Sequence, residues 1–202
     1  ERSEPAPMSA YTLTIEHVLK HPVRDIHPIA WSLFYHMRYA AHPVPDAVLY
    51  AMMIRACAAG VPQPNTMPLR RKRTMEADAE RALDLFREMT VHHGVRPNKE
   101  VYDSLILTCA RRKDHYADAL RLLHELVEGD HTRLWPDAYT YNAVLQGSAR
   151  HGDLTTARWI LADMVRSVMA DAHRLRRPNE DTLAHVFWTY AVYQPPIDRH
   201  QL

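Results

Sequence analysis

A short pattern of residues recurs along the chain and restricts its possible folds more than any other feature. Each copy starts with tyrosine and has isoleucine or leucine four positions later: Tyr50-Ala-Met-Met-Ile, Tyr102-Asp-Ser-Leu-Ile, Tyr141-Asn-Ala-Val-Leu and a weaker Tyr11-Thr-Leu-Thr-Ile. Turns lie just before most copies, at Pro45-Asp46, Pro97-Asn98 and Pro136-Asp137, and Pro178-Asn179 precedes a variant with Leu183 in the tyrosine place. Proline ends the preceding helix, and the Asp or Asn oxygen caps the first amides of the next.

A second pattern follows every tyrosine copy. It reads Ala-x-x-[Leu/Ile]-[Leu/Phe]-x-x-[Met/Leu] and occurs at Ala30 to Met37, Ala82 to Met89, Ala119 to Leu126 and Ala157 to Met164. Offsets of three, four and seven put these apolar residues on one helix face, where the small alanine permits close approach of a neighbouring helix. Each repeat is therefore predicted to be a helical hairpin, with the tyrosine on helix A and the alanine on helix B.

The spacing of the copies predicts a stacked array of hairpins. Tyr11, Tyr50, Tyr102 and Tyr141 are 39, 52 and 39 residues apart, which fits a basic period of about 35 with insertions. One hairpin cannot bury its apolar face alone, so tandem hairpins stack into a solenoid. We predict a single all-α domain over residues 1–202, with repeats at about 8–45, 46–97, 98–136 and 137–178, a partial repeat at 179–202, and a basic loop insertion at 61–77.

Composition excludes several classes of function. Lys and Arg number 25 against 24 Asp and Glu, a net charge of +1, so any basic site must be local. No apolar run approaches the roughly 20 residues of a membrane helix, and we expect no membrane span. The few glycines form no phosphate-binding loop, and no Gly-x-Ser-x-Gly or zinc-deaminase signature is present. We therefore expect no enzymatic activity, no catalytic residue and no cofactor.

Two groups of potential metal or redox residues are interpreted as structural. His17 and His21 could share a helix face, but a zinc site needs further ligands that the sequence does not position, so no metal site is expected. Cys57 and Cys109 each stand seven residues after a repeat tyrosine. They are predicted to be small packing residues rather than a disulfide pair, because equivalent points on stacked helices lie too far apart.

The two patterns together resemble the pentatricopeptide repeat family, which is similar in its Pro-Asp turn, its Tyr-Asn helix start and its Ala-x-x-Leu-Phe-x-x-Met second helix. The resemblance covers roughly residues 8–192, and the best copy is Asp137 to Arg177. It implies a right-handed α-solenoid of helix-turn-helix repeats that binds single-stranded RNA, one base per repeat. The tetratricopeptide repeat is a poorer match, because its tyrosine lies late in helix A.

The resemblance also assigns roles in RNA recognition to individual residues. Base reading is implied for the residue after each helix-A tyrosine together with the capping residue of the next turn. These pairs are Thr12 with Asp46, Ala51 with Asn98, Asp103 with Asp137, and Asn142 with Asn179. Ala51 has no hydrogen-bonding group, and Asp103 beside Asp137 would offer acceptors only, so these two pairs predict no particular base.

Two further sets of positions follow from the same resemblance. Apolar side chains two residues before the tyrosine are expected to wedge between bases, which fits Val48 and Tyr139, whereas Glu100 and Asp181 place carboxylates there. Basic residues nine positions after the tyrosine are expected to contact phosphates, at Lys20, Arg111 and Arg150. The A-to-B turns hold further cations, at Arg70 to Arg73, Arg111 to Lys113, and Arg150 with His151, which predict a basic rim or, alternatively, simply solvate the turns.

Two functional hypotheses remain at this stage. The first is a sequence-selective RNA-binding adaptor in the mitochondrial matrix, acting in RNA processing, stability, translation or ribosome function, with single-stranded RNA and a ribosomal or RNA-processing complex as partners. The second is an RNA-independent helical scaffold or supernumerary subunit that binds protein. The acidic residues of the concave surface favour the scaffold, and an aromatic helix at Leu183 to Tyr193 needs a cover.

Overall fold

The computed structural model describes residues 6–20, 26–59, 61–62, 75–128, 134–169 and 177–194. They form two compact units, Glu1–Thr108 and Cys109–Leu202, with the boundary inside helix α5. The first unit contains α1 (Met8–Lys20), α2 (Ile26–Ala40), α3 (Ala47–Ala58), α4 (Ala79–Arg87), a π-helical turn η1 (Glu88–His92) and most of α5 (Lys99–Ala110). The second contains α6 (Tyr116–Glu128), α7 (Ala138–His151), α8 (Leu154–Met169) and α9 (Glu180–Val192).

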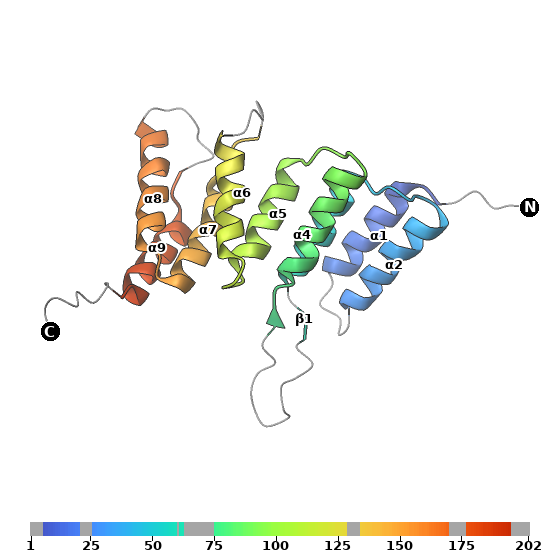
Figure 1. Ribbon diagram of the computed structural model, residues 1–202, viewed down its shortest axis with the longest axis horizontal. Coiled ribbons are helices and arrows are strands. Elements are labelled where there is room, and N and C mark those ends of the chain that lie inside the picture. The colour runs from blue at the N-terminus through green and yellow to red at the C-terminus, as the bar shows by residue number, and fades with distance from the viewer. Residues whose placement is uncertain are drawn as a thin grey trace, which may run out of the picture. The chain divides into compact units, whose positions relative to one another are not determined.

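The predicted all-α fold of helical hairpins is confirmed. In the first unit α1 packs against α2 and α3 against α4, and in the second α7 packs against α8 (Figure 1). Successive helices A also stack, because α1 contacts α3 and α7 contacts α9. Whether residues 1–202 behave as one domain stays a prediction.

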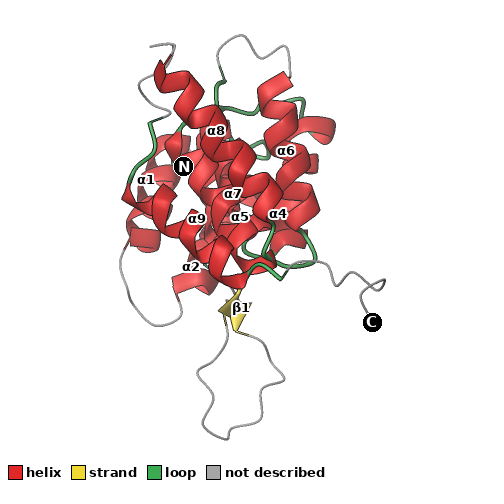
Figure 2. Ribbon diagram, turned by 90° about the vertical axis from the view of Figure 1, so that its left-hand side faces the viewer, coloured by secondary structure: helices red, strands yellow, loops and turns green. Residues whose placement is uncertain are grey.

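The basic insertion at 61–77 begins and ends in a small antiparallel ladder. Strands β1 (Val61–Pro62) and β2 (Met75–Glu76) pair Val61 with Glu76 and Pro62 with Met75. Figure 2 shows this ladder below the red helices. The insertion was predicted to be a loop throughout, so the pairing of its two ends is a correction, while residues 63–74, including Arg70 to Arg73, lie outside the described residues.

The predicted capping residues start the helices as expected. Asp46 accepts a hydrogen bond from the Leu49 amide at 2.8 Å, and Asn98 accepts one from the Val101 amide at 3.0 Å. Asp137 and Asn179 each form a reciprocal capping box with a threonine three residues later. These bonds satisfy first-turn amides that have no partner inside a helix.

The repeat tyrosines and alanines form the hairpin cores. Tyr50 and Tyr141 are fully buried, Tyr102 is almost so, and Ala30, Ala82, Ala119 and Ala157 have no exposed surface. The last apolar residue of each helix-B motif is buried as well, at Met37, Met89, Leu126 and Met164. The residue types that define the two sequence patterns are thus those that bring helix A against helix B.

The buried tyrosine hydroxyls bond to residues at equivalent positions of helix B. Tyr50 donates to the Glu88 carboxylate and Tyr141 to the Asp163 carboxylate, each at 2.6 Å. Both acids stand six residues after the motif alanine, and so does His36, whose Nδ1 lies 3.3 Å from the Tyr11 hydroxyl. Burial, reinforced by the bond to Glu88, raises the pKa of Tyr50 above its usual value. The phenol therefore stays protonated and serves as the donor.

The two cysteines have the predicted structural role. Cys57 and Cys109 are buried free thiols, and burial raises the pKa of each to about 12. Thiolate is therefore scarce at neutral pH, and these residues act as small apolar groups.

The tyrosine–acid bond can be tested by removing one hydroxyl. Tyr141→Phe is expected to lower the free energy of unfolding by about 1–3 kcal/mol, because it leaves the Asp163 carboxylate without its buried donor. Urea unfolding followed by circular dichroism measures the change. Tyr190→Phe on exposed α9 is the control. Equal effects of the two substitutions would contradict the proposed importance of the bond.

Candidate nucleic-acid interface

The structure brings together one complete pair of predicted base-reading residues. Asn142 lies in the first turn of α7 and Asn179 caps α9, and the Asn142 Nδ2 donates to the Asn179 Oδ1 at 3.0 Å. The stacking of α7 on α9 makes this contact possible between residues 37 positions apart. Asn179 is exposed and Asn142 is half-buried, so the amide pair is accessible from solvent.

The pairs of the first unit are engaged in bonds within their own helices. The Thr12 hydroxyl donates to the Met8 carbonyl at 3.1 Å, while Asp46 caps α3. Ala51 is only 5% exposed and Asn98 caps α5. Burial leaves Ala51 little surface to offer a base, in addition to its lack of a polar group.

Asp103 and Asp137 belong to different units, so their pairing stays a prediction. Asp103 is buried and forms an ion pair with Lys99 one helical turn earlier, at 2.5 Å. The carboxylate was expected to offer only acceptors to a base, and the nearby ammonium offsets much of its charge. The four-residue spacing of Lys99 and Asp103 was a visible signal that the sequence interpretation did not use.

The predicted wedge residues are exposed. Val48 and Tyr139 show 42% and 43% of their surface to solvent near the starts of α3 and α7. The carboxylates Glu100 and Asp181, two residues before Tyr102 and Leu183, are exposed as well. The wedge positions that are apolar and those that are acidic are therefore all exposed at the surface.

Two of the three predicted phosphate-contacting residues lie together. Arg150 Nη1 donates to the backbone carbonyl of Arg111 at 2.6 Å, and Arg111 Nε donates to Gln146 Oε1 at 3.4 Å. Partial burial and the nearby Arg111 charge lower the pKa of Arg150. Lys20, in the other unit, is largely exposed and pairs with Glu16 at 2.5 Å.

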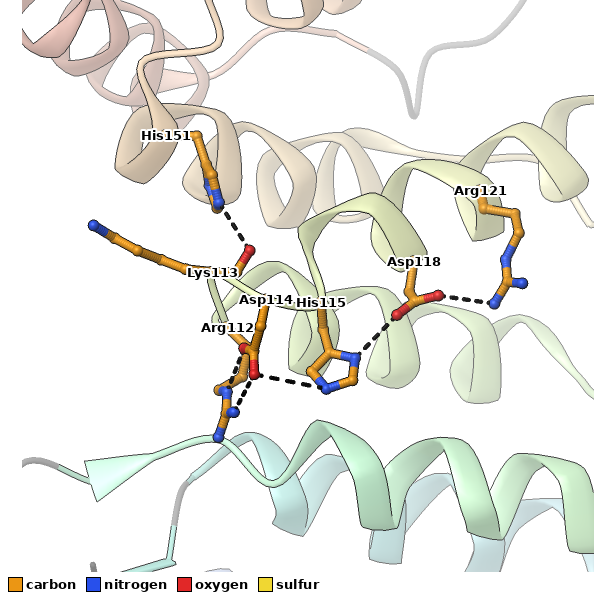
Figure 3. Close-up of polar contacts among 7 residues, drawn as sticks. All are labelled: Arg112, Lys113, Asp114, His115, Asp118, Arg121 and His151. Atoms are coloured by element: carbon orange, nitrogen blue, oxygen red, sulfur yellow. Dashed lines mark hydrogen bonds and ion pairs between the residues drawn. The ribbon is translucent and has the colours of Figure 1, made fainter.

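The turn that follows α5 is a mixed-charge cluster rather than a purely basic rim (Figure 3). Arg112 binds Asp114 through two nitrogens, which lowers the pKa of that carboxyl to about 2. Asp118 binds His115 and Arg121, each at 3.0 Å. The basic-rim interpretation counted the cations of this turn and missed that Asp114, two residues after Arg112, neutralises that side chain.

Neighbouring turns do line up as the repeat predicted. The His151 Nε2 lies 3.1 Å from the Lys113 carbonyl (Figure 3), and its Nδ1 lies 3.0 Å from the Gly147 carbonyl. The His151 ring also stacks on Tyr116, with 4.4 Å between ring centroids. These contacts join the turn after α5 to the end of α7, and so hold Arg111 beside Arg150.

A buried polar contact that the sequence interpretation missed joins α6 to α7. The Tyr116 hydroxyl lies 2.7 Å from Ser148 Oγ and donates to Asp153 Oδ2 at 3.0 Å. The tyrosine ring fits because Gly147 has no side chain: a Cβ there would lie 2.8 Å from two ring carbons. A glycine inside the predicted helix was the signal, since such a glycine often marks a close approach.

The family model described as the PPR repeat, the pentatricopeptide repeat, matches residues 139–167, which cover most of α7 and α8. Crystal structures of the pentatricopeptide repeat protein PPR10, in the original form and as a C256S/C430S/C449S variant, each align with 94% of this chain and 23% of PPR10. The TM-score is 0.60 and the sequence identity 20% in both cases.

Residues 139–167, most of the α7–α8 hairpin, are therefore a pentatricopeptide repeat. Both PPR10 crystals contain an 18-nucleotide psaJ RNA element. At this identity the likeness shows that the pentatricopeptide fold is shared.

Two curated relatives carry the same name, mitochondrial 15S rRNA processing factor CCM1. The protein from Candida tropicalis is 26% identical over 174 residues, and that from Yarrowia lipolytica is 31% identical over 140 residues. The alignments include 86% and 69% of this chain but only 19% and 16% of the relatives. The chain thus spans about a fifth or less of each relative's length.

Two other kinds of site, a membrane span and a metal centre, are absent from the described residues. None of their helices has the combination of length and apolar character that a bilayer crossing requires. The same residues contain no group of three or more His, Cys, Asp or Glu side chains arranged to hold a metal ion. His21, one of the two histidines considered for a metal, lies outside the described residues.

The close approach at Gly147 gives a prediction for repeat stacking. In an open helix Gly→Ala stabilises by up to about 1 kcal/mol, but Gly147→Ala is expected to destabilise by about 1–3 kcal/mol because the methyl group meets the Tyr116 ring. Chemical denaturation measures the change in the free energy of unfolding and its sign. In a Tyr116→Ala background the same change is expected to become neutral or stabilising. An equal cost in both backgrounds would contradict the steric explanation.

Proposed function

We propose that this chain is the RNA-binding part of a mitochondrial RNA-processing adaptor and that it reads single-stranded RNA with side chains at the starts of its helices A. The observation that carries the proposal is the solvent-accessible Asn142–Asn179 amide pair, held by the stacked helices α7 and α9, and two arginines meet at the other end of α7. Unstacked bases expose Watson–Crick edges that such amides can bind.

The hydrogen-bonding state of the pair favours particular base edges. Asn179 Oδ1 already accepts the Thr182 amide and Asn142 Nδ2. One N–H of Asn142 and both N–H groups of Asn179 remain for a ligand, so the pair is mainly a donor. Such a surface suits the carbonyl and ring-nitrogen acceptors of a pyrimidine better than the donor-rich edge of guanine. The resemblance to the pentatricopeptide repeat also implies a pyrimidine for this pair.

The arginine edge supplies attraction that does not depend on sequence. Arg111 and Arg150 are one repeat apart and in contact, which suits successive phosphates of one strand. Each neutralised phosphate releases bound counterions and contributes about 0.7 to the salt dependence of single-strand binding. Lys20 would add a similar contact in the first unit.

The biological setting of the proposal comes from the relatives. Two curated relatives are mitochondrial rRNA processing factors by name, and PPR10 is crystallised with RNA. We therefore propose that this chain lies in the mitochondrion and supports maturation, stability or translation of RNA through binding, without catalysis of its own. A ribosomal or RNA-processing complex is the proposed protein partner.

Selection from a randomised single-stranded RNA pool tests the function directly. We expect a short enriched motif whose binding weakens with salt. Arg111→Ala should weaken all sequences alike and reduce the salt slope by about 0.7, whereas Asn142→Ser should change the preferred base at one position only.

Two controls make this experiment decisive. Arg158→Ala removes an exposed cation of α8 that is not among the predicted phosphate contacts, and it should leave the salt slope unchanged. Double-stranded RNA should not compete with the selected motif. Absence of binding at low salt, or a uniform loss for all four bases with Asn142→Ser, would contradict RNA binding or base reading, respectively.

The exposed face of α9 favours a second candidate, the protein scaffold. In the complete hairpin, Tyr141 and Leu145 of α7 are fully buried, and α8 packs on that helix. The equivalent residues of α9, Leu183 and Phe187, are 46% and 70% exposed. A scaffold would use this face to bind an amphipathic helix of another protein, with a small residue at its centre as in helix B.

A synthetic peptide with the α8 sequence, residues 154–169, is a defined probe for that face. If the scaffold hypothesis holds, titration should shift amide NMR signals of α9, and Phe187→Ser should weaken the binding about tenfold or more through lost apolar contact. Arg158→Ala again serves as the control for non-specific effects. Unchanged α9 signals at millimolar peptide would contradict this hypothesis without affecting the RNA proposal.

A further inference from the structure

Thr182 lies at the centre of the predicted base-reading pair Asn142–Asn179. Its hydroxyl is 2.7 Å from Asn142 Oδ1 and 2.9 Å from Asn179 Oδ1, and the backbone N–H of Asn179 donates to it at 3.1 Å. The residue is fully buried, so no part of it can contact a base. Any influence on recognition must act through the two asparagines.

The available protons decide how the network is arranged. Asn179 Oδ1 accepts from the backbone N–H of Thr182 and from Asn142 Nδ2. These two bonds occupy both lone pairs of the Asn179 oxygen. The single hydroxyl proton of Thr182 is therefore donated to Asn142 Oδ1, the shorter of its two contacts. This arrangement fixes the Asn142 amide with its oxygen toward Thr182 and its nitrogen toward Asn179.

The opposite orientation of the Asn142 side-chain amide is unfavourable. Turning the amide would place Asn142 Oδ1 against Asn179 Oδ1, and the bond between the two side chains would be lost. Two acceptors in contact cannot share a hydrogen bond, and a partly buried group left without its partner is costly. Asn179 Oδ1 thus selects one of two amide orientations that differ in what they offer to solvent, and the bond from the Thr182 hydroxyl to Asn142 Oδ1 holds the amide in it.

Packing alone does not require a threonine at this position. The corresponding third residues of α3 and α5 are Leu49 and Val101, which are also fully buried. Their side chains neither donate nor accept hydrogen bonds. A polar side chain at Thr182 therefore adds a directed contact to the neighbouring repeat that an apolar residue of similar size would not provide.

We propose that Thr182 is a specificity-determining positioning residue, whose hydroxyl orients the Asn142 amide and so sets which base edge the Asn142–Asn179 pair reads. The inference rests on the proposed RNA-binding function. It differs from a capping role, because a cap stabilises α9 and affects all RNA sequences alike, whereas orientation of Asn142 affects discrimination at one base.

The test compares Thr182→Val, which keeps shape and removes the hydroxyl, with Thr182→Ser, which keeps the hydroxyl. Four RNA oligonucleotides differ only at the base read by Asn142, identified from the Asn142→Ser variant. Thr182→Val is expected to reduce discrimination between the best and worst base about fivefold, the effect of one net hydrogen bond. Thr182→Ser should retain it. Thr189→Val, which removes a buried hydroxyl bound to the His185 carbonyl in the same helix, should leave it unchanged.

A second readout needs no RNA and separates this inference from the proposed function. The Asn142 side-chain amide should give two well-separated NMR signals in the free wild-type protein, and Thr182→Val should broaden them or speed their exchange with solvent. An unaltered Asn142 amide, or an equal loss of affinity for all four bases, would overturn the positioning role. Failure of the wild-type chain to bind RNA would overturn the proposed function itself, and with it the role in specificity.

Discussion

The interaction on which the structure depends is the burial of a helix-A tyrosine against helix B. The ring lies in the core of the hairpin, and the hydroxyl bonds to the helix-B residue six positions after the motif alanine, as Tyr50 does with Glu88 and Tyr141 with Asp163. Burial of the ring supplies stability without direction, whereas the hydrogen bond fixes how one helix is rotated against the other. Because helix A is held in one rotation, the residue after the tyrosine always lies at the same angle.

Stacking of repeats converts that local order into a surface. The contact of α7 with α9 brings Asn142 to Asn179, and the Tyr116 contact with Ser148 and Asp153 joins α6 to α7. Arg111 and Arg150 meet at the turns that these contacts align. The proposed readout and the proposed phosphate edge of the second unit are therefore consequences of inter-repeat packing.

The repeats are unequal in what they can do. Asn142 is accessible and polar, Ala51 is buried and apolar, and Asp103 is neutralised by Lys99. A chain with this surface is expected to recognise few bases by itself and to hold RNA through its edge elsewhere.

The sequence by itself determined the hairpins, their boundaries and the row of candidate residues. Periodicity, proline turns and caps act over a few residues, so Tyr141, Ala157, Asp137 and Asn179 could be assigned their structural places before any coordinates were known. Only the tertiary structure decided which candidates meet and how they are paired. The Thr182 hydroxyl, the Lys99–Asp103 pair and the neutralised turn at Asp114 depend on directions and distances of side chains. Hydrogen bonds and ion pairs are short-ranged and directional, and a sequence period locates residues on a helix face without specifying those directions.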